Sequence, residues 1–173
     1  SPRPATDQWV AVTALMAQVR SVGEALSKGQ HALQVGWAQG AELAGSSTEI
    51  QSALTNLVTN AVRYTPPGGA IQVSWSIRDD GAGVLEVADS GPGIAKEHLP
   101  RLTERFYRVD GGRSRETGGT GLGLSIVKHV IQRHGGQVDI ASEVGKGSTF
   151  RLVFPAFRVK VAQKEGPASD STP

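Results

Sequence analysis

A capped amphipathic helix that leads into two alternating strands constrains the fold of this chain more than any other feature. Ser46 with Glu49 three residues later forms a capping box, which predicts the start of a helix, and the Pro-Pro-Gly-Gly run after Tyr64 ends it. Residues 71–77 then alternate as a half-buried strand does, and residues 84–89 return as a second strand after a glycine turn. Segregated helices and hairpins predict an α+β protein, with helices on one face of a mixed, mainly antiparallel sheet.

The rest of the chain supplies further elements of the same kind. An apolar stripe predicts a helix over residues 9–28, and we prefer a helix packed on its own domain because a coiled coil has only about two heptads of support. Its stripe consists of Val12, Leu15, Val19, Val22 and Leu26. The other expected elements are short strands at 31–37 and 41–45, a short helix at 96–105, a helix at 122–134, and a closing hairpin at 137–142 and 149–155. The polar residues after Pro155 predict a disordered tail.

Length and composition exclude several classes of protein. The 173 residues suffice for one domain with a core. No apolar run approaches the ~20 residues of a membrane span, and the N-terminus lacks the pattern of a signal peptide, so we expect a soluble chain. A piece cut from a membrane-anchored parent would look the same. The absence of cysteine excludes disulfides and thiolate metal sites, and a net charge of +2 is too small to indicate a nucleic-acid partner.

A glycine-rich loop, "TGGTGLGLS" at residues 117–125, leads directly into the predicted helix at 122–134. Its backbone N–H groups and the helix N-terminus would form an anion site, although the loop matches neither a P-loop nor a Rossmann fingerprint. The alternative is a glycine hinge for a lid, and the two are compatible. Arginines gather upstream of it in a fifteen-residue stretch that fits a phosphate ligand better than a solvated surface: Arg101, Arg105, Arg108, Arg113 and Arg115.

A polar line runs along the helix at 47–64. Asn56, Asn60 and Arg63 lie roughly 80–140° around the helix from its apolar stripe. A single Asn on a helix is usually a surface residue, but two at i and i+4 followed by Arg suit phosphate oxygens and a hard cation. An amide oxygen can serve as one ligand of Mg²⁺, which prefers oxygen ligands.

The stretch "ADSGPGI" places Asp89 at the end of a predicted strand. A buried carboxylate there would accept a hydrogen bond from the exocyclic amine of adenine, whereas guanine presents a carbonyl. An unpaired buried acceptor costs about 1–3 kcal/mol, so one Asp could select adenine. Gly91 and Gly93 would let the backbone approach the base. A plain turn remains the alternative.

Four segments together resemble the sensor histidine kinases, and among them those of the phosphate regulon. They are "NLVTNAVRYTPPGG" (N box), "DSGPGI" (G1 box), "RFYRVD" (F box) and "GGTGLGLSIVKHV" (G2 box), in the family's order. The resemblance implies a two-layer α/β sandwich of the Bergerat (GHKL) type with a flexible ATP lid. It implies an ATP-binding domain at residues 31–157, a helix and linker at 1–30 that follow a missing dimerisation hairpin, and a tail at 158–173.

The resemblance also implies roles for individual residues. Asn60, helped by Asn56, would bind Mg²⁺, and Arg63 stands where the family often has a phosphate-binding Lys. Tyr64 would pack on adenine and Asp89 would bind its amine. Phe106 would anchor the lid, and Thr149 matches a threonine near the Asp. Further nucleotide contacts are implied at Gly91, Gly93, Ile94, Arg115, Gly119, Thr120, Gly121, Leu122 and Gly123.

None of the four histidines stands in the family's phosphoacceptor motif. The expected function is therefore that of the ATP-binding catalytic domain of a longer kinase, which passes the γ-phosphate of Mg-ATP to a histidine on another domain. The expected partners are that domain and a response regulator of the PhoB type, the expected location is the cytoplasm, and the fragment should be largely monomeric.

Two other functions remain open. The first is an ATP-hydrolysing conformational switch, as in gyrase or Hsp90, where a Glu one turn before the magnesium Asn activates water. This chain has Asn56 there, and an amide is no general base. The second is a nucleotide-binding interaction module without chemistry.

Overall fold

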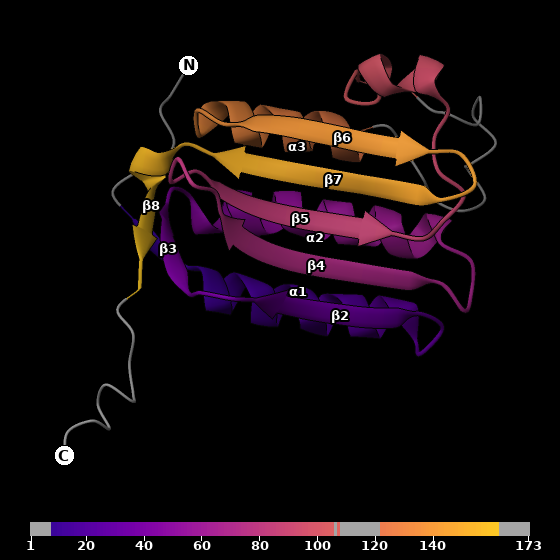
Figure 1. Ribbon diagram of the computed structural model, residues 1–173, viewed down its shortest axis with the longest axis horizontal. Helices are drawn as coiled ribbons and strands as arrows, with labels where there is room; N and C mark the ends of the chain where they lie inside the picture. Colours follow the sequence, from indigo (N-terminus) through magenta and orange to yellow (C-terminus); the bar gives the residue numbers. More distant parts are fainter. Residues whose placement is uncertain (1–7, 106, 108–121, 163–173) are drawn as a thin grey trace.

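A five-stranded sheet forms one layer of the molecule in the computed structural model, which describes residues 8–105, 107 and 122–162. The strand order is β2-β4-β5-β7-β6 (Figure 1). The strands are β2 (Ala32–Trp37), β4 (Ala70–Ile77), β5 (Gly83–Asp89), β6 (Gln137–Glu143) and β7 (Gly147–Phe154). Only β2 and β4 run parallel, and the other three pairs are antiparallel. The expected mixed, mainly antiparallel sheet is confirmed.

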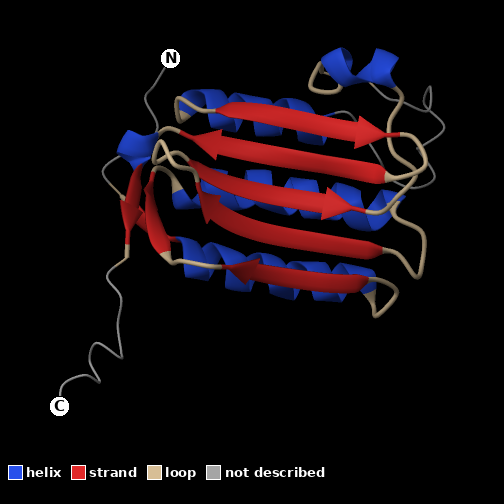
Figure 2. Cartoon of the chain, in the orientation of Figure 1, coloured by secondary structure: helices blue, strands red, loops and turns tan. Residues whose placement is uncertain are grey.

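Three helices form the second layer and cover one face of this sheet (Figure 2). They are α1 (Val12–Ser27), α2 (Ser47–Tyr64) and α3 (Leu122–Arg133), and α2 lies between the other two. The core lies between the layers, where large side chains such as Trp75, Leu54 and Ile131 are fully buried. The predicted two-layer α+β sandwich is confirmed.

The local signals for α2 hold in the structure. The Ser46 hydroxyl accepts a hydrogen bond from the backbone N–H of Glu49 at 3.2 Å, which is the capping interaction that the sequence predicts.

In α1 the buried stripe is Val12, Leu15, Met16 and Val19, so this helix packs on its own domain, as expected. Leu26 was expected in that stripe but is 43% exposed. It lies in the last turn, just before Lys28 leaves the helix in the left-handed conformation.

A second, three-stranded sheet lies at one end of the sandwich (Figure 1). It consists of β1 (Trp9–Ala11), β3 (Ala41–Ala44) and β8 (Val159–Val161), in the order β1-β3-β8. Two expectations were wrong here. Residues 9–11 are a strand instead of the first turn of a helix, and residues 159–161 pair with β3 instead of joining a disordered tail.

The short helix expected at 96–105 is a 3-10 helix, η1 (Lys96–Arg101), and a second one, η3 (Ala156–Arg158), precedes β8. Tyr107 is held against η1, because its hydroxyl bonds the His98 ring and the Arg101 guanidinium lies 4.4 Å from its ring centroid. In the described part of the chain, no helix has the length and apolar character that crossing a membrane requires.

Candidate functional site

The polar edge of α2 carries three of the predicted site residues. Asn56, Asn60 and Arg63 are all half-buried. Arg63 donates a hydrogen bond from Nη1 to the Asn60 side-chain oxygen at 3.4 Å. The guanidinium of Arg63 and the side-chain amide of Asn60, one turn earlier, therefore lie side by side near the carboxyl end of the helix.

Asp89 is the last residue of β5 and is half-buried. It is flanked in the sheet by Ile71 of β4 and Ser148 of β7. One carboxylate oxygen accepts a hydrogen bond from the Gly91 N–H at 2.9 Å. Burial raises the pKa of the Asp89 carboxyl above its ordinary value, and backbone hydrogen bonds from Gly91 and Ser148 counteract part of that rise.

The end of α2 and the end of β5 meet at Gly91, which is buried. A Cβ on Gly91 would lie 3.1 Å from Asp89 Oδ1, 3.2 Å from Thr65 Oγ1 and 3.2 Å from the Tyr64 carbonyl oxygen. The Tyr64 side chain itself is 46% exposed. The fold thus brings Asp89 and Gly91 against the carboxyl end of α2, the helix that carries the predicted polar edge.

Gly93 and Ile94 follow in the same loop and are fixed to the β6–β7 turn. Gly93 has a φ of 77°, and a Cβ there would lie 2.2 Å from the Glu143 carbonyl oxygen. The Ile94 N–H donates to the Ser142 hydroxyl at 2.8 Å. Packing therefore explains the glycine at position 93, because a side chain there would prevent the loop backbone from lying against this turn.

Thr149 does not lie beside Asp89. In the ladder Asp89 pairs with Ser148, and Thr149 pairs with Ala88. Because side chains alternate along a strand, Thr149 lies on the sheet face that the helices leave open, whereas Ser148 lies on the helix side and is 6% exposed. The expectation for Thr149 was wrong by one residue, and Ser148 is the neighbour of Asp89.

Sequence reasoning missed two residues at the end of α2. The Nε2–H of His31 donates to the Thr65 carbonyl at 2.7 Å, and its Nδ1 lies 2.9 Å from the Ser27 hydroxyl. This bridge ties the end of α1 to the end of α2. Thr65 is buried. It stands within the N-box segment, but no local pattern marks a threonine as buried.

Several predicted contacts fall outside the described residues. They are Phe106, Arg108, Arg113, Arg115, Gly119, Thr120 and Gly121, and most of the predicted ATP lid lies there too. Leu122 and Gly123 are the first two residues of α3, so the glycine-rich stretch does lead into a helix as predicted.

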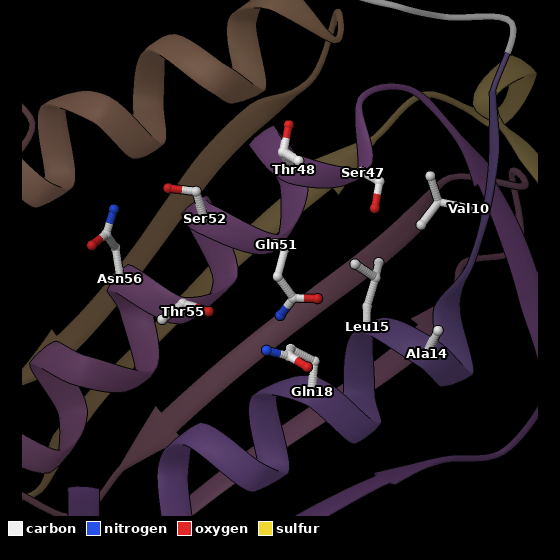
Figure 3. A pocket seen from close by; sticks show the side chains of 10 residues that line it. All are labelled: Val10, Ala14, Leu15, Gln18, Ser47, Thr48, Gln51, Ser52, Thr55 and Asn56. Atoms are coloured by element: carbon white, nitrogen blue, oxygen red, sulfur yellow. The ribbon is translucent and has the colours of Figure 1, made fainter.

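A groove of about 550 Å³ lies between α1 and the amino-terminal part of α2 (Figure 3). Gln18 and Gln51 point toward one another across it, and Asn56 is at one end. Asn56 is the one predicted site residue in its lining, and Asp89, Asn60 and Tyr64 are not part of it. The groove is therefore separate from the junction at Gly91.

The donor set of the polar edge is compatible with a single hard cation. Among the described residues there is no cluster of three or more His, Cys, Asp or Glu side chains that could enclose a metal. Asn60 nevertheless offers a half-buried neutral oxygen beside a guanidinium. Mg²⁺ keeps waters and phosphate oxygens in its shell, so one such protein oxygen fits an ion that arrives with a nucleotide.

Comparison with known proteins agrees with this geometry. The model of the family described as histidine kinase-, DNA gyrase B- and HSP90-like ATPases matches residues 45–158. The phosphate regulon sensor protein PhoR of Pseudomonas aeruginosa is 48% identical over 165 residues, which are 95% of this chain and 37% of that protein. Sensor protein SrrB of Staphylococcus aureus is 46% identical over 106 residues, 61% of this chain and 18% of that protein. The chain thus spans well under half the length of these relatives.

Solved structures give the same result. A mycobacterial sensor histidine kinase, MprB, superposes with a TM-score of 0.79 at 27% identity, covering 90% of this chain and 100% of that one. Full-length ShkA in complex with AMPPNP superposes with a TM-score of 0.74 at 27% identity, covering 91% of this chain and 32% of that one. This chain belongs to the histidine kinase-, DNA gyrase B- and HSP90-like ATPase family, and within it to the ATP-binding domains of sensor histidine kinases.

Proposed function

We propose that this domain binds Mg-ATP between the polar edge of α2 and the end of β5, and transfers the γ-phosphate to a histidine on a separate domain. The observation that carries the proposal is the position of Asp89, a half-buried carboxylate of raised pKa beside the end of the helix that holds Asn60 and Arg63. A carboxylate held at a desolvation cost next to cation- and phosphate-binding groups suits a ligand with an amine at one end and anions at the other.

Asp89 selects the base in this proposal. An ionised carboxylate only accepts hydrogen bonds, so it pairs with the exocyclic amine of adenine and opposes the carbonyl of guanine. Tyr64, whose carbonyl lies at the junction with Gly91 and whose side chain is 46% exposed, packs on the base.

Asn60 and Arg63 serve the phosphate end. The Arg63 guanidinium donates to one lone pair of the Asn60 oxygen, which orients the amide and leaves the second lone pair for the ion. Asn56 lies one turn earlier on the same edge of α2 and contributes to the same coordination shell of the Mg²⁺ ion. The bound Mg²⁺ supplies charge neutralisation to the transferring phosphoryl group, and the residues of the edge position it.

The chain's own histidines do not suit the role of phosphoacceptor. His31 is bonded through both ring nitrogens, His98 bonds the Tyr107 hydroxyl, and His134 is fully buried. His129 is exposed on α3 but does not stand in the phosphoacceptor motif. We therefore assign the acceptor to another domain of a cytoplasmic kinase region. The identity with PhoR favours a PhoB-type response regulator of the phosphate regulon as the final recipient.

An ATPase switch is the rival function, and the side chains of α2 disfavour it. Asn56 cannot take a proton from water. Glu49 is the one acidic residue of α2, and Arg133 of α3 donates to both of its carboxylate oxygens at 3.2 Å. This helix therefore offers no uncommitted carboxylate as a general base.

Phosphoryl transfer in trans tests the proposal. The chain is mixed with γ-labelled Mg-ATP and a separately expressed hairpin domain that carries the phosphoacceptor histidine of Pseudomonas aeruginosa PhoR. We expect acid-labile label on the hairpin and little free phosphate. Asn60→Ala should remain folded but lose transfer, whereas Ser52→Ala, on the exposed side of the same helix, should transfer normally. Fast release of free phosphate with no labelled hairpin would support the ATPase instead.

A further inference from the structure

Thr65 carries a buried hydroxyl that lacks a hydrogen-bond partner among the described residues. The residue is 3% exposed and caps the carboxyl end of α2. Its backbone is fully bonded, because its N–H donates to the Ala61 carbonyl at 3.0 Å and its carbonyl accepts from His31 at 2.7 Å. Buried polar groups are nearly always paired, so an orphaned hydroxyl at a fixed backbone position calls for an explanation.

The hydroxyl lies at the junction where β5 ends. Thr65 Oγ1 and Asp89 Oδ1 lie 3.2 Å and 3.1 Å from the same point, the position that a Cβ on Gly91 would take. The absence of a side chain at Gly91 leaves both oxygens beside the same small space. One of them belongs to a hydroxyl that can donate, and the other to a carboxylate that can accept more than one hydrogen bond.

Packing fixes which way the hydroxyl faces. The Thr65 methyl group lies against Gly69, where a Cβ would come within 2.3 Å of it. With the methyl group on that side and the backbone held by His31, the hydroxyl is directed toward the space at Gly91.

We infer that Thr65 is a positioning residue of the adenine subsite, which donates its hydroxyl hydrogen to Asp89 when the carboxylate turns to the base. The inference rests on the proposed function, since it assigns Asp89 to the exocyclic amine. In the structure one oxygen of the carboxylate accepts from the Gly91 N–H at 2.9 Å. A hydroxyl that donates to Asp89 favours its ionised form, which is the form that accepts from an amine.

Two substitutions at position 65 separate this role from a structural one. Thr65→Val keeps the shape and removes the unpaired hydroxyl, so its unfolding temperature without nucleotide should equal or exceed that of the unsubstituted chain. Its affinity for Mg-ATP, measured by calorimetric titration, should fall about five- to tenfold. Thr65→Ser loses the methyl contact at Gly69 but keeps the donor, so it should unfold at a lower temperature and bind Mg-ATP normally.

A double-mutant cycle with Asp89→Asn tests whether Thr65 acts through Asp89. In the Asp89→Asn background, Thr65→Val should cause little further loss of affinity. Equal binding by the unsubstituted chain and Thr65→Val would overturn the inference, and so would a loss that adds in full to that of Asp89→Asn. If the unsubstituted chain bound no ATP, the proposed function would be wrong and this role with it. If the unsubstituted chain bound ATP and Thr65→Val bound it equally well, only the role of Thr65 would be overturned, and the proposed function would stand.

Discussion

At the scale of single residues, Asp89 shows a conflict between folding and binding. Burial raises the pKa of its carboxyl in the folded state above the ordinary value of 3.8. A group of this kind stabilises the fold fully only below its unfolded-state pKa, and that contribution is lost as the pH rises through the folded-state pKa. At neutral pH the ionised Asp89 therefore lowers the stability of the ligand-free domain relative to a neutral side chain of the same shape.

Asp89→Asn should expose this conflict. We expect the ligand-free variant to be as stable as the unsubstituted chain or more stable at pH 7, because the buried charge is gone while the Gly91 hydrogen bond can remain. Affinity for ATP should fall about tenfold or more, because an amide can present its NH₂ group to the adenine amine. Thermal unfolding and titration with a fluorescent ATP analogue measure the two effects.

Asp139→Asn is the matched control, because Asp139 lies on β6 with its carboxylate 3.9 Å from Arg78, away from the site. It should leave ATP affinity unchanged. Unchanged affinity in Asp89→Asn as well would remove Asp89 from the site.

The sequence predicted the site residues of α2 and Asp89 because each depends on local order along the chain. Asn56, Asn60 and Arg63 share a helix edge through a period of 3.6 residues, and Asp89 ends a strand whose alternation is visible. The expectation that Thr149 lies near Asp89 was wrong, because neighbouring residues of a strand point to opposite faces of the sheet. Thr65 was missed because the burial of its hydroxyl depends on Gly91, which lies far away in sequence.

At the scale of secondary-structure elements, the same distinction holds. The expected starts and ends of α2 and β4 to β7 lie within two residues of the observed ones, because caps, alternation and glycine turns are local signals. The strands β1 and β8 were missed because three-residue strands form only through pairing with a distant partner, in this case β3. The parallel pairing of β2 with β4 likewise depends on α2 crossing between distant segments.

The contact between α2 and α3 should depend on pH. His134 follows α3 and is fully buried; its Nδ1–H donates to the Val130 carbonyl at 2.8 Å and its Nε2 accepts from the Ser46 N–H at 3.1 Å. These two bonds require the neutral ring, and burial lowers the pKa of His134 below 6.5. Since the folded-state pKa is depressed, the stabilisation is complete above the unfolded-state pKa and is lost as the pH falls through the folded-state pKa.

The free energy of unfolding should therefore decrease as the pH falls below about 6.5, and the full loss, about 1.4 kcal/mol for each unit that separates the two pKa values, is reached below the folded-state pKa. Urea unfolding over this range measures it. His134→Gln should reduce the slope of stability against pH, whatever its absolute stability. An identical slope in the variant would mean that another group is responsible.

The loop after β5, which packs against the β6–β7 turn, depends on the glycine at position 93. Gly93→Ala should destabilise the domain by more than ~2 kcal/mol and weaken ATP binding, because a Cβ would lie 2.2 Å from the Glu143 carbonyl oxygen and push the loop off the β6–β7 turn. Gly145→Ala is the control. Its φ of 87° imposes a similar backbone strain, but nothing lies within 4 Å of its Cβ position, so it should cost only about 1–2 kcal/mol. Chemical denaturation measures the free energy of unfolding of both variants. Equal losses would show that backbone strain alone, and not the contact with Glu143, causes the destabilisation.

At the scale of the whole molecule, the two ends of the sandwich have different roles. The end of β5 and the carboxyl end of α2 form the candidate site, and the β1-β3-β8 sheet closes the opposite end (Figure 1). The groove between α1 and α2 lies along the helical layer, apart from the junction at Gly91 (Figure 3). The proposed ATP site at the junction therefore occupies one end of the molecule, away from the groove.

Nuclear magnetic resonance of the backbone amides during a titration with Mg-ATP shows which end of the molecule binds the nucleotide. A titration should shift the amide signals of residues 60–65 and 89–94, with small shifts in β1, β3 and β8 at the other end. Asp89→Asn should weaken these shifts at the same ATP concentration. Shifts confined to the three-stranded sheet or to the Gln18 and Gln51 groove, with residues 89–94 unchanged, would contradict the account.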